Sequence, residues 1–208
     1  MVEVRSVAPD ALFAPGLSPF QVKGTLWMGF RGYVDQHVVG GSARLGESLT
    51  PACREFFAQL FVAPGWYDLF PMLEISRAVA LVRGVAASEQ ARQTGTWHGE
   101  QDLKGIYKTL LKQATPQAIC RRYPSLYSQL YNFGRVEVTV ADGSAESCAY
   151  GMPEPLAYWW MPATEGYLQP ILIAAGAPHA RTTWRAMVAD GESHGVRLVR
   201  VPSHTTWT

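Results

Sequence analysis

Cys53 is the side chain whose type and position most directly suggest covalent chemistry. It follows Thr50-Pro51, a pair that predicts the start of a helix, so the thiol would lie about three residues into that helix. The partial positive charge of a helix N-terminus lowers the pKa of a thiol and favours the nucleophilic thiolate. Five histidines are scattered along the chain, so a Cys–His dyad stays open. A cysteine-dependent enzyme using Cys53 is therefore one alternative, and a half-buried packing residue is the competing interpretation.

His98 is the best single candidate for a cofactor ligand. It lies beside Trp97 in a predicted helix that also contains Gly95, Gly99 and Gly105. Each glycine costs about 1 kcal/mol relative to alanine inside a helix, so another backbone or a ligand is expected to approach closely there. A flat tetrapyrrole could do so, and one proximal histidine can hold haem iron. A haem or other tetrapyrrole sensor using His98 is the second alternative.

Consecutive aromatic residues carry the favoured interpretation. Tyr158, Trp159 and Trp160 cannot all face one side of a regular helix, because neighbouring residues point about 100° apart. At least one ring must face solvent or a cleft. Tyrosine and tryptophan combine a large contact area with one polar group, which suits peptides and amphipathic small molecules. The expected ligand-binding residues are Trp97, His98, Tyr107, Tyr158, Trp159, Trp160 and Trp184.

These features favour a non-catalytic binding protein that holds a peptide segment or an apolar small molecule in an aromatic cleft. Its expected setting is an accessory role in a bacterial biosynthetic or regulatory pathway. No catalytic residue, metal site or cofactor is expected under this interpretation, and haem remains the alternative cofactor. The chain lacks the P-loop, G-x-G-x-x-G and H-E-x-x-H motifs. Glu100 and Asp102 lie two apart in one predicted helix, which indicates a solvated helix surface.

Composition narrows the class of partner. The 208 residues carry a net charge of +1. This charge is much smaller than the excess of basic residues expected of a protein that binds nucleic acid or an anionic membrane. Three cysteines without a C-x-x-C pair predict neither a disulfide framework nor a zinc site, and they fit a reducing cytoplasm. The most apolar run, residues 167–177, is too short to span a bilayer, and no export signal is expected. A monomer or a homo-oligomer is compatible with these features.

Hydrophobic periodicity predicts helices first and strands last. Apolar residues at helical spacing predict about five helices, over residues 18–41, 50–65, 71–82, 88–113 and 115–131, the last kinked at Pro124. The period then becomes two, which predicts a hairpin over residues 136–150 that turns at Asp142-Gly143. A helix over residues 155–175, broken near Pro162 or Pro170, separates it from strands over residues 181–189 and 196–201. Asp190-Gly191 and Gly195 mark the turn between those two strands.

The predicted fold class is therefore α+β, with about five N-terminal helices packed on a C-terminal antiparallel sheet of about four strands. The two hairpins of that sheet are separated by a helix. Residues 1–17 are expected to form an N-terminal arm, and residues 18–208 a single α+β ligand-binding domain.

Several phrases between residues 22 and 201 carry a family resemblance. They are VKGTLWMGFRGYV, Gly65-Trp66-Tyr67, GTWHGEQDLKGIYKTLLK, YNFGRVEVTVADG and DGESHGVRLVRV. In order and spacing they resemble a roughly 200-residue family of unknown function that is expanded in myxobacteria. The layout of that family is similar to the 4-vinyl-reductase and haem nitric-oxide-binding domains, which implies a small-molecule sensor or carrier.

The chain departs from that family in two places. Residues 190–194 lack a cysteine often found in such a terminal hairpin, which argues against cysteine metal ligation. The Trp159-Trp160 pair is not expected of the family and suggests a particular ligand.

Overall fold

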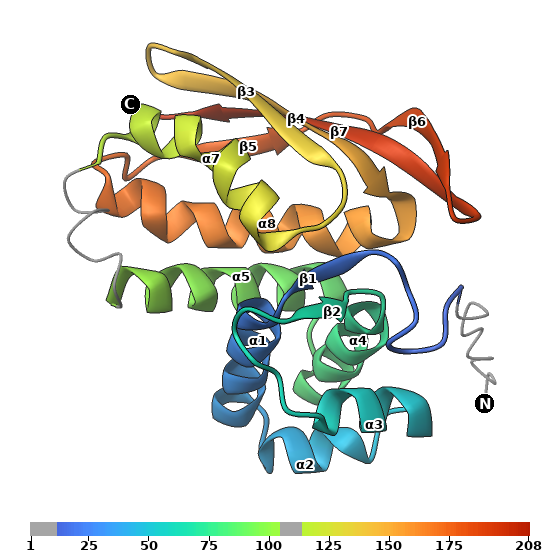
Figure 1. The fold of residues 1–208 in the computed structure, drawn as a ribbon. Helices are drawn as coiled ribbons and strands as arrows, with labels where there is room; N and C mark the ends of the chain where they lie inside the picture. The colour runs from blue at the N-terminus through green and yellow to red at the C-terminus, as the bar shows by residue number, and fades with distance from the viewer. Residues whose placement is uncertain (1–11, 105–113) are drawn as a thin grey trace, which may run out of the picture.

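The structure, a computed structural model, describes residues 12–104 and 114–208. An antiparallel sheet forms one layer, α8 and α7 lie against it, α5 follows, and the N-terminal helices lie beyond α5 (Figure 1). The N-terminal elements are β1 (Gln21–Lys23), α1 (Gly24–His37), α2 (Gly41–Gly46), α3 (Pro51–Ala58), β2 (Trp66–Asp68), α4 (Pro71–Arg83) and α5 (Ala87–Lys104). The C-terminal elements are α7 (Pro116–Leu130), β3 (Arg135–Ala141), β4 (Ser144–Pro153), α8 (Glu154–Ala174), β5 (Arg181–Trp184), β6 (Val188–Ser193) and β7 (Val196–Thr206).

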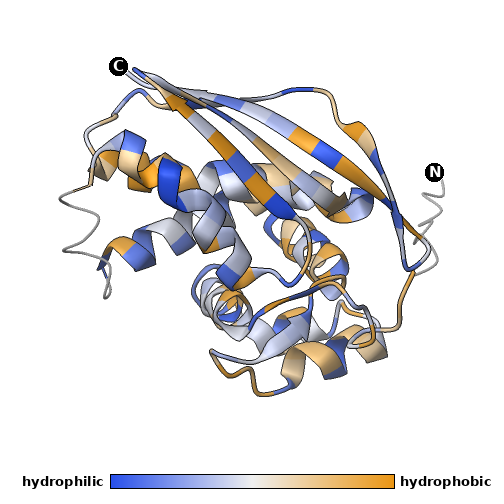
Figure 2. Ribbon diagram, turned by 45° about the horizontal axis from the view of Figure 1, so that its top comes forward, coloured by the Kyte–Doolittle hydropathy of each residue, from blue (hydrophilic) through white to orange (hydrophobic). Residues whose placement is uncertain are grey.

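The C-terminal sheet has the order β3-β4-β7-β5, and β6 pairs with the other half of β7. Every neighbouring pair is antiparallel. Hydrophobic and hydrophilic residues alternate along its strands (Figure 2), as expected for a sheet that buries one face against helices. The predicted α+β class, with helices packed on a C-terminal antiparallel sheet, is confirmed.

Several predicted boundaries were wrong for identifiable reasons. The sheet has five strands in the described residues, because the predicted strand 181–189 is two short strands that pair with different parts of β7. Asp190-Gly191 lies inside β6 at a shift of register, and the turn falls at His194-Gly195, both with positive φ. Helix α8 continues through Pro162 and Pro170, since each proline removes only one backbone donor from a well-packed helix.

The N-terminal half contains elements that local periodicity did not predict. Residues Gln21–Lys23 form a strand rather than the start of a helix, because they pair with Trp66–Asp68 more than forty positions later. A short helix, α2, follows Gly40, and α3 ends at Ala58, before the predicted stop at Pro64-Gly65. The helix predicted over residues 88–113 corresponds to α5, which the structure describes as far as Lys104. The last part of the predicted helix lies outside the described residues.

Helices α5 and α8 pack with their backbones in contact. A Cβ atom on Gly166 would lie 2.0 Å from the carbonyl oxygen of Arg92, and one on Gly99 would lie 2.5 Å from that of Tyr167. The sequence predicted such an approach at Gly95 and Gly99, and the structure supplies it from another helix. Gly105 lies outside the described residues. Within residues 12–104 and 114–208, no helix combines the length and apolar character needed to cross a membrane.

Candidate functional site

A cavity of about 330 Å³ lies between α1, α5, α7 and α8, and we call it the four-helix cavity. This volume is at the lower end of the roughly 300–1,000 Å³ typical of small-molecule sites. Apolar and aromatic side chains dominate its lining. The lining residues are Thr25, Leu26, Gly29, Thr94, Gly95, Trp97, His98, Gln101, Asp102, Tyr123, Leu126, Tyr127, Gln129, Leu130, Tyr131, Trp159, Trp160, Ala163, Thr164 and Tyr167.

His98 reaches this cavity from α5. Burial lowers the pKa of the imidazole to about 4, and the nearby Gly29 backbone opposes this effect only in part. Its Nε2 atom is buried and has no hydrogen-bond partner. A Cβ atom on Gly29 would lie 2.7 Å from Nε2, so the glycine of α1 makes room for the ring. His98 is therefore a neutral imidazole with an unused nitrogen at pH 7.

Trp97 lines the cavity beside His98 and is fixed against α1. Its Nε1–H donates to Oε1 of Gln36 over 3.2 Å. The indole also lies over Gly32, where a Cβ atom would come within 3.1 Å of its Cη2 atom.

The three consecutive aromatic residues of α8 do not all face the same way, as the geometry of a helix requires. Trp159 and Trp160 are 9% and 3% exposed and both line the cavity, whereas Tyr158 is 61% exposed and does not. Trp160 packs edge-on against Trp184, with ring centroids 5.6 Å apart. Trp184 therefore supports the wall without lining the cavity. Tyr107 lies outside the described residues.

Three tyrosines of α7 and its C-terminal end form a wall of the cavity, and none of them is among the expected ligand-binding residues. Tyr123, Tyr127 and Tyr131 recur every fourth residue and line the cavity together. Burial raises the pKa of all three phenols. The rings of Tyr127 and Tyr131 stack with centroids 4.6 Å apart, and Tyr127 Oη has no hydrogen-bond partner. The helical spacing of one residue type was the available signal.

Asp102 corrects another expectation. It lines the cavity one helical turn after His98, whereas Glu100 is exposed as predicted. Its Oδ2 accepts a hydrogen bond from Tyr167 Oη over 2.8 Å. Burial raises the pKa of the Asp102 carboxyl, and the Tyr167 hydrogen bond opposes the rise. A carboxyl group thus lies in the wall of a mainly apolar cavity.

Cys53 lacks the properties of a catalytic cysteine. The side chain is 2% exposed. Burial, followed by a hydrogen bond with Glu74, raises the pKa of the thiol to about 12, so desolvation outweighs the helix N-terminus. Within the described part of the chain, no group of three or more His, Cys, Asp and Glu side chains could hold a metal ion.

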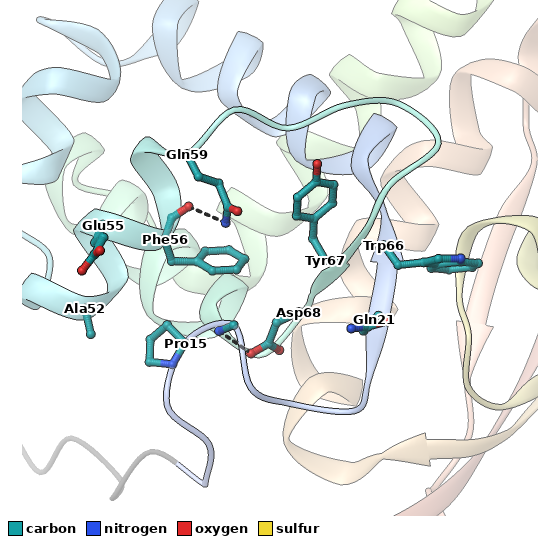
Figure 3. A pocket seen from close by; sticks show the side chains of 10 residues that line it. Pro15, Gln21, Ala52, Glu55, Phe56, Gln59, Trp66, Tyr67 and Asp68 are labelled. Carbon is teal, nitrogen blue, oxygen red and sulfur yellow. Dashed lines mark hydrogen bonds between the residues drawn. The ribbon is translucent and has the colours of Figure 1, made fainter.

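A second hollow, of about 570 Å³, lies between α3 and β2 (Figure 3). Its buried carboxylate, Asp68, already accepts hydrogen bonds from the backbone N–H groups of Gly16, Ser18 and Phe70. Trp66, at the opposite end of the hollow from Glu55, is covered by the Lys23 ammonium 3.9 Å above its ring. These polar groups hold neighbouring segments of the chain, so we place the candidate site in the four-helix cavity.

Comparisons with known proteins place this geometry in a known fold. No family model matches the chain, and no curated relative matches it. The resemblance to a family of unknown function expanded in myxobacteria therefore gains no support. Solved structures do match: the chain is 13% identical, with a TM-score of 0.63, to one described as modulating haem redox potential through protein-induced porphyrin distortion. That match covers 89% of this chain and 99% of the other.

Two further matches are H-NOX proteins. One is an oxygen-binding H-NOX domain related to soluble guanylate cyclases, with 13% identity, a TM-score of 0.57, and coverage of 89% of this chain and 95% of that one. The other is an Fe(II) unliganded H-NOX protein from K. algicida, with 10% identity, a TM-score of 0.58, and coverage of 89% and 96%.

The chain therefore has the H-NOX fold, in agreement with the predicted haem nitric-oxide-binding layout. The expectation of a protein without a cofactor is wrong on this comparison, because matching structures of this fold are described as haem or iron proteins. The comparison points to haem, the alternative cofactor, and gives no support to a peptide partner.

Proposed function

We propose that this chain is a haem-binding or related tetrapyrrole-binding sensor domain whose ligand occupies the four-helix cavity. The proposal depends on the neutral imidazole of His98, whose buried Nε2 has no hydrogen-bond partner, in the wall of an aromatic cavity. The H-NOX fold supports it at the level of architecture.

The residues of the cavity fit such a ligand in two respects. Iron binds the neutral form of imidazole, and burial keeps His98 in that form at pH 7. The rings of Trp159, Trp160 and Tyr123 offer apolar surface to a flat macrocycle. When bound, haem would supply an iron centre able to bind a diatomic gas or to change its oxidation state.

The remaining lining residues position the ligand and exclude water. Tyr127 and Trp159 each contain a buried polar atom without a partner, Oη and Nε1 respectively, in addition to Nε2 of His98. Such atoms are costly to bury, so a ligand that reorganises the wall can gain binding energy from them. A peptide segment is less favoured, since Trp159 and Trp160 are buried in the wall rather than displayed on the surface.

The cytoplasm is the compartment we propose for this domain. The three cysteines are all unpaired, which supports a reducing environment.

Haemin titration of the purified chain tests the proposed function. We expect a shift of the haemin Soret band that saturates at one equivalent. His98→Ala should weaken haemin binding at least about tenfold, and added imidazole should restore the spectrum. His179→Ala, which changes an exposed histidine, is the matched control. Absence of a saturable Soret shift, or equal haemin binding by parent and His98→Ala, would exclude this function.

A further inference from the structure

Asp102 is the one charged side chain among the described residues that line the four-helix cavity. It lies on α5, one helical turn from His98, and is half-buried. None of the ion pairs in the described residues includes it. The cavity therefore has a negative group in its wall without a cationic side chain beside it in the described lining.

Tyr167 holds this carboxylate in place from the opposite helix. Its hydroxyl donates to Oδ2 of Asp102 over 2.8 Å. Tyr167 is itself fixed by backbone packing, because its carbonyl oxygen lies against Gly99 of α5. The orientation of the carboxylate is thus set by the contact between α5 and α8 rather than by a flexible surface side chain.

Loss of hydration determines which ligand groups the Asp102 carboxylate would bind. A carboxylate at an apolar wall has lost part of its hydration, and hydrogen bonds from N–H groups or a nearby cation compensate for that loss. Tyr167 supplies one donor to Oδ2. A second carboxylate at this place would instead add like-charge repulsion in a site of low dielectric constant.

We propose that Asp102, positioned by Tyr167, is a specificity-determining subsite of the four-helix cavity that selects planar ligands bearing a cationic or N–H nitrogen. The subsite excludes carboxylates from this end of the cavity. The inference rests on the proposed function only in that the cavity binds a ligand, and it does not depend on iron. For a tetrapyrrole with carboxylate side chains, it directs those carboxylates away from Asp102.

Three probes of one shape test the subsite. They are 9-aminoacridine, which is cationic at neutral pH, neutral acridine, and anionic acridine-9-carboxylate. We expect fluorescence titration at pH 7.5 to give affinities in that order, with at least about a tenfold difference between the amine and the carboxylate. Asp102→Asn keeps the shape of the side chain and removes its charge, so it should abolish the preference. Glu100→Gln removes an exposed charge of the same helix and should leave the preference unchanged.

Three outcomes of these titrations would contradict the proposed subsite. Equal affinities for the three probes, no binding of any probe, or an unchanged preference in a natively folded Asp102→Asn variant would overturn the subsite. Circular dichroism of each variant checks the fold.

Haemin binding is a separate measurement. No saturable Soret shift together with the expected order of acridine affinities would reject haem and support the subsite. A His98-dependent Soret shift with equal acridine affinities would support haem binding and reject the subsite.

Discussion

Gly95 of α5 lies so close to Ala163 of α8 that a Cβ atom on the glycine would come within 2.0 Å of the alanine carbonyl oxygen. The two helices therefore meet backbone to backbone. They also carry most of the chemistry of the site, with His98 and Asp102 on α5 and Trp160 on α8. This contact sets the distance between two walls of the four-helix cavity.

We expect Gly95→Ala to destabilise the protein. Alanine in a free helix position would stabilise by up to about 1 kcal/mol, but overpacking against a backbone costs about 1–3 kcal/mol or more. Urea unfolding measures the difference. Gly46→Ala is the matched control, because a Cβ atom there meets only the Arg54 side chain at 3.5 Å. If Gly95→Ala were as stable as Gly46→Ala, the two helices could not be in contact.

Local signals predicted the elements that local forces build. The start of α4 at Pro71 and the hairpin turn at Asp142-Gly143 follow from residues next to them in the chain. Strands β1 and β2 could not be predicted in this way, because each has three residues and Gln21 pairs with Asp68. Their stability comes from pairing and burial that only the tertiary structure supplies.

The residues of the candidate site likewise divide into those that the sequence singled out and those that it missed. Rare or conspicuous residues such as His98 and Trp160 stand out in the sequence, and the structure places both in the wall of one cavity. Asp102 was missed because charge spacing alone does not say which face of a helix is buried. A signal was present: Asp102 lies three residues after Gly99, on the side of α5 that meets α8.

Stability should fall in mild acid because of His98. Its pKa is about 4 in the folded protein, where burial disfavours the charged form, against a usual 6.5. Between these values the unfolded chain binds a proton that the folded chain does not. The free energy of unfolding therefore decreases as pH falls from about 6.5 to about 4, by up to about 3 kcal/mol in the ligand-free protein.

Chemical denaturation of the parent and of His98→Gln at a series of pH values measures this contribution. The variant cannot gain the proton, so its stability should depend less on pH across this window. Parallel pH profiles for the two proteins would show that His98 does not titrate as its burial requires.

Cys53 should be unreactive in the native state. Burial raises the pKa of its thiol to about 12, so almost no thiolate is present at pH 8, and the side chain is inaccessible. We expect Ellman's reagent to modify Cys53 only after unfolding, with the site identified by peptide mass spectrometry. Cys148, less buried on β4, is the internal comparison. Faster modification of Cys53 than of Cys148 in folded protein would restore the catalytic interpretation.

Trp159 and Tyr158 are neighbours in sequence with opposite expected effects on ligand binding. Trp159 lines the cavity and its buried Nε1 has no hydrogen-bond partner, whereas Tyr158 is 61% exposed. Trp159→Phe should weaken haemin or 9-aminoacridine binding about 2- to 10-fold, because part of an aromatic contact surface is lost. The cost in stability should be small for a tryptophan this buried, because the substitution also removes an unsatisfied N–H group. Tyr158→Ala should change neither affinity nor stability appreciably. Ligand titrations of both variants, each with a native circular dichroism spectrum, measure these effects. Unchanged affinity in Trp159→Phe, or a loss of affinity confined to Tyr158→Ala, would place the ligand outside the four-helix cavity.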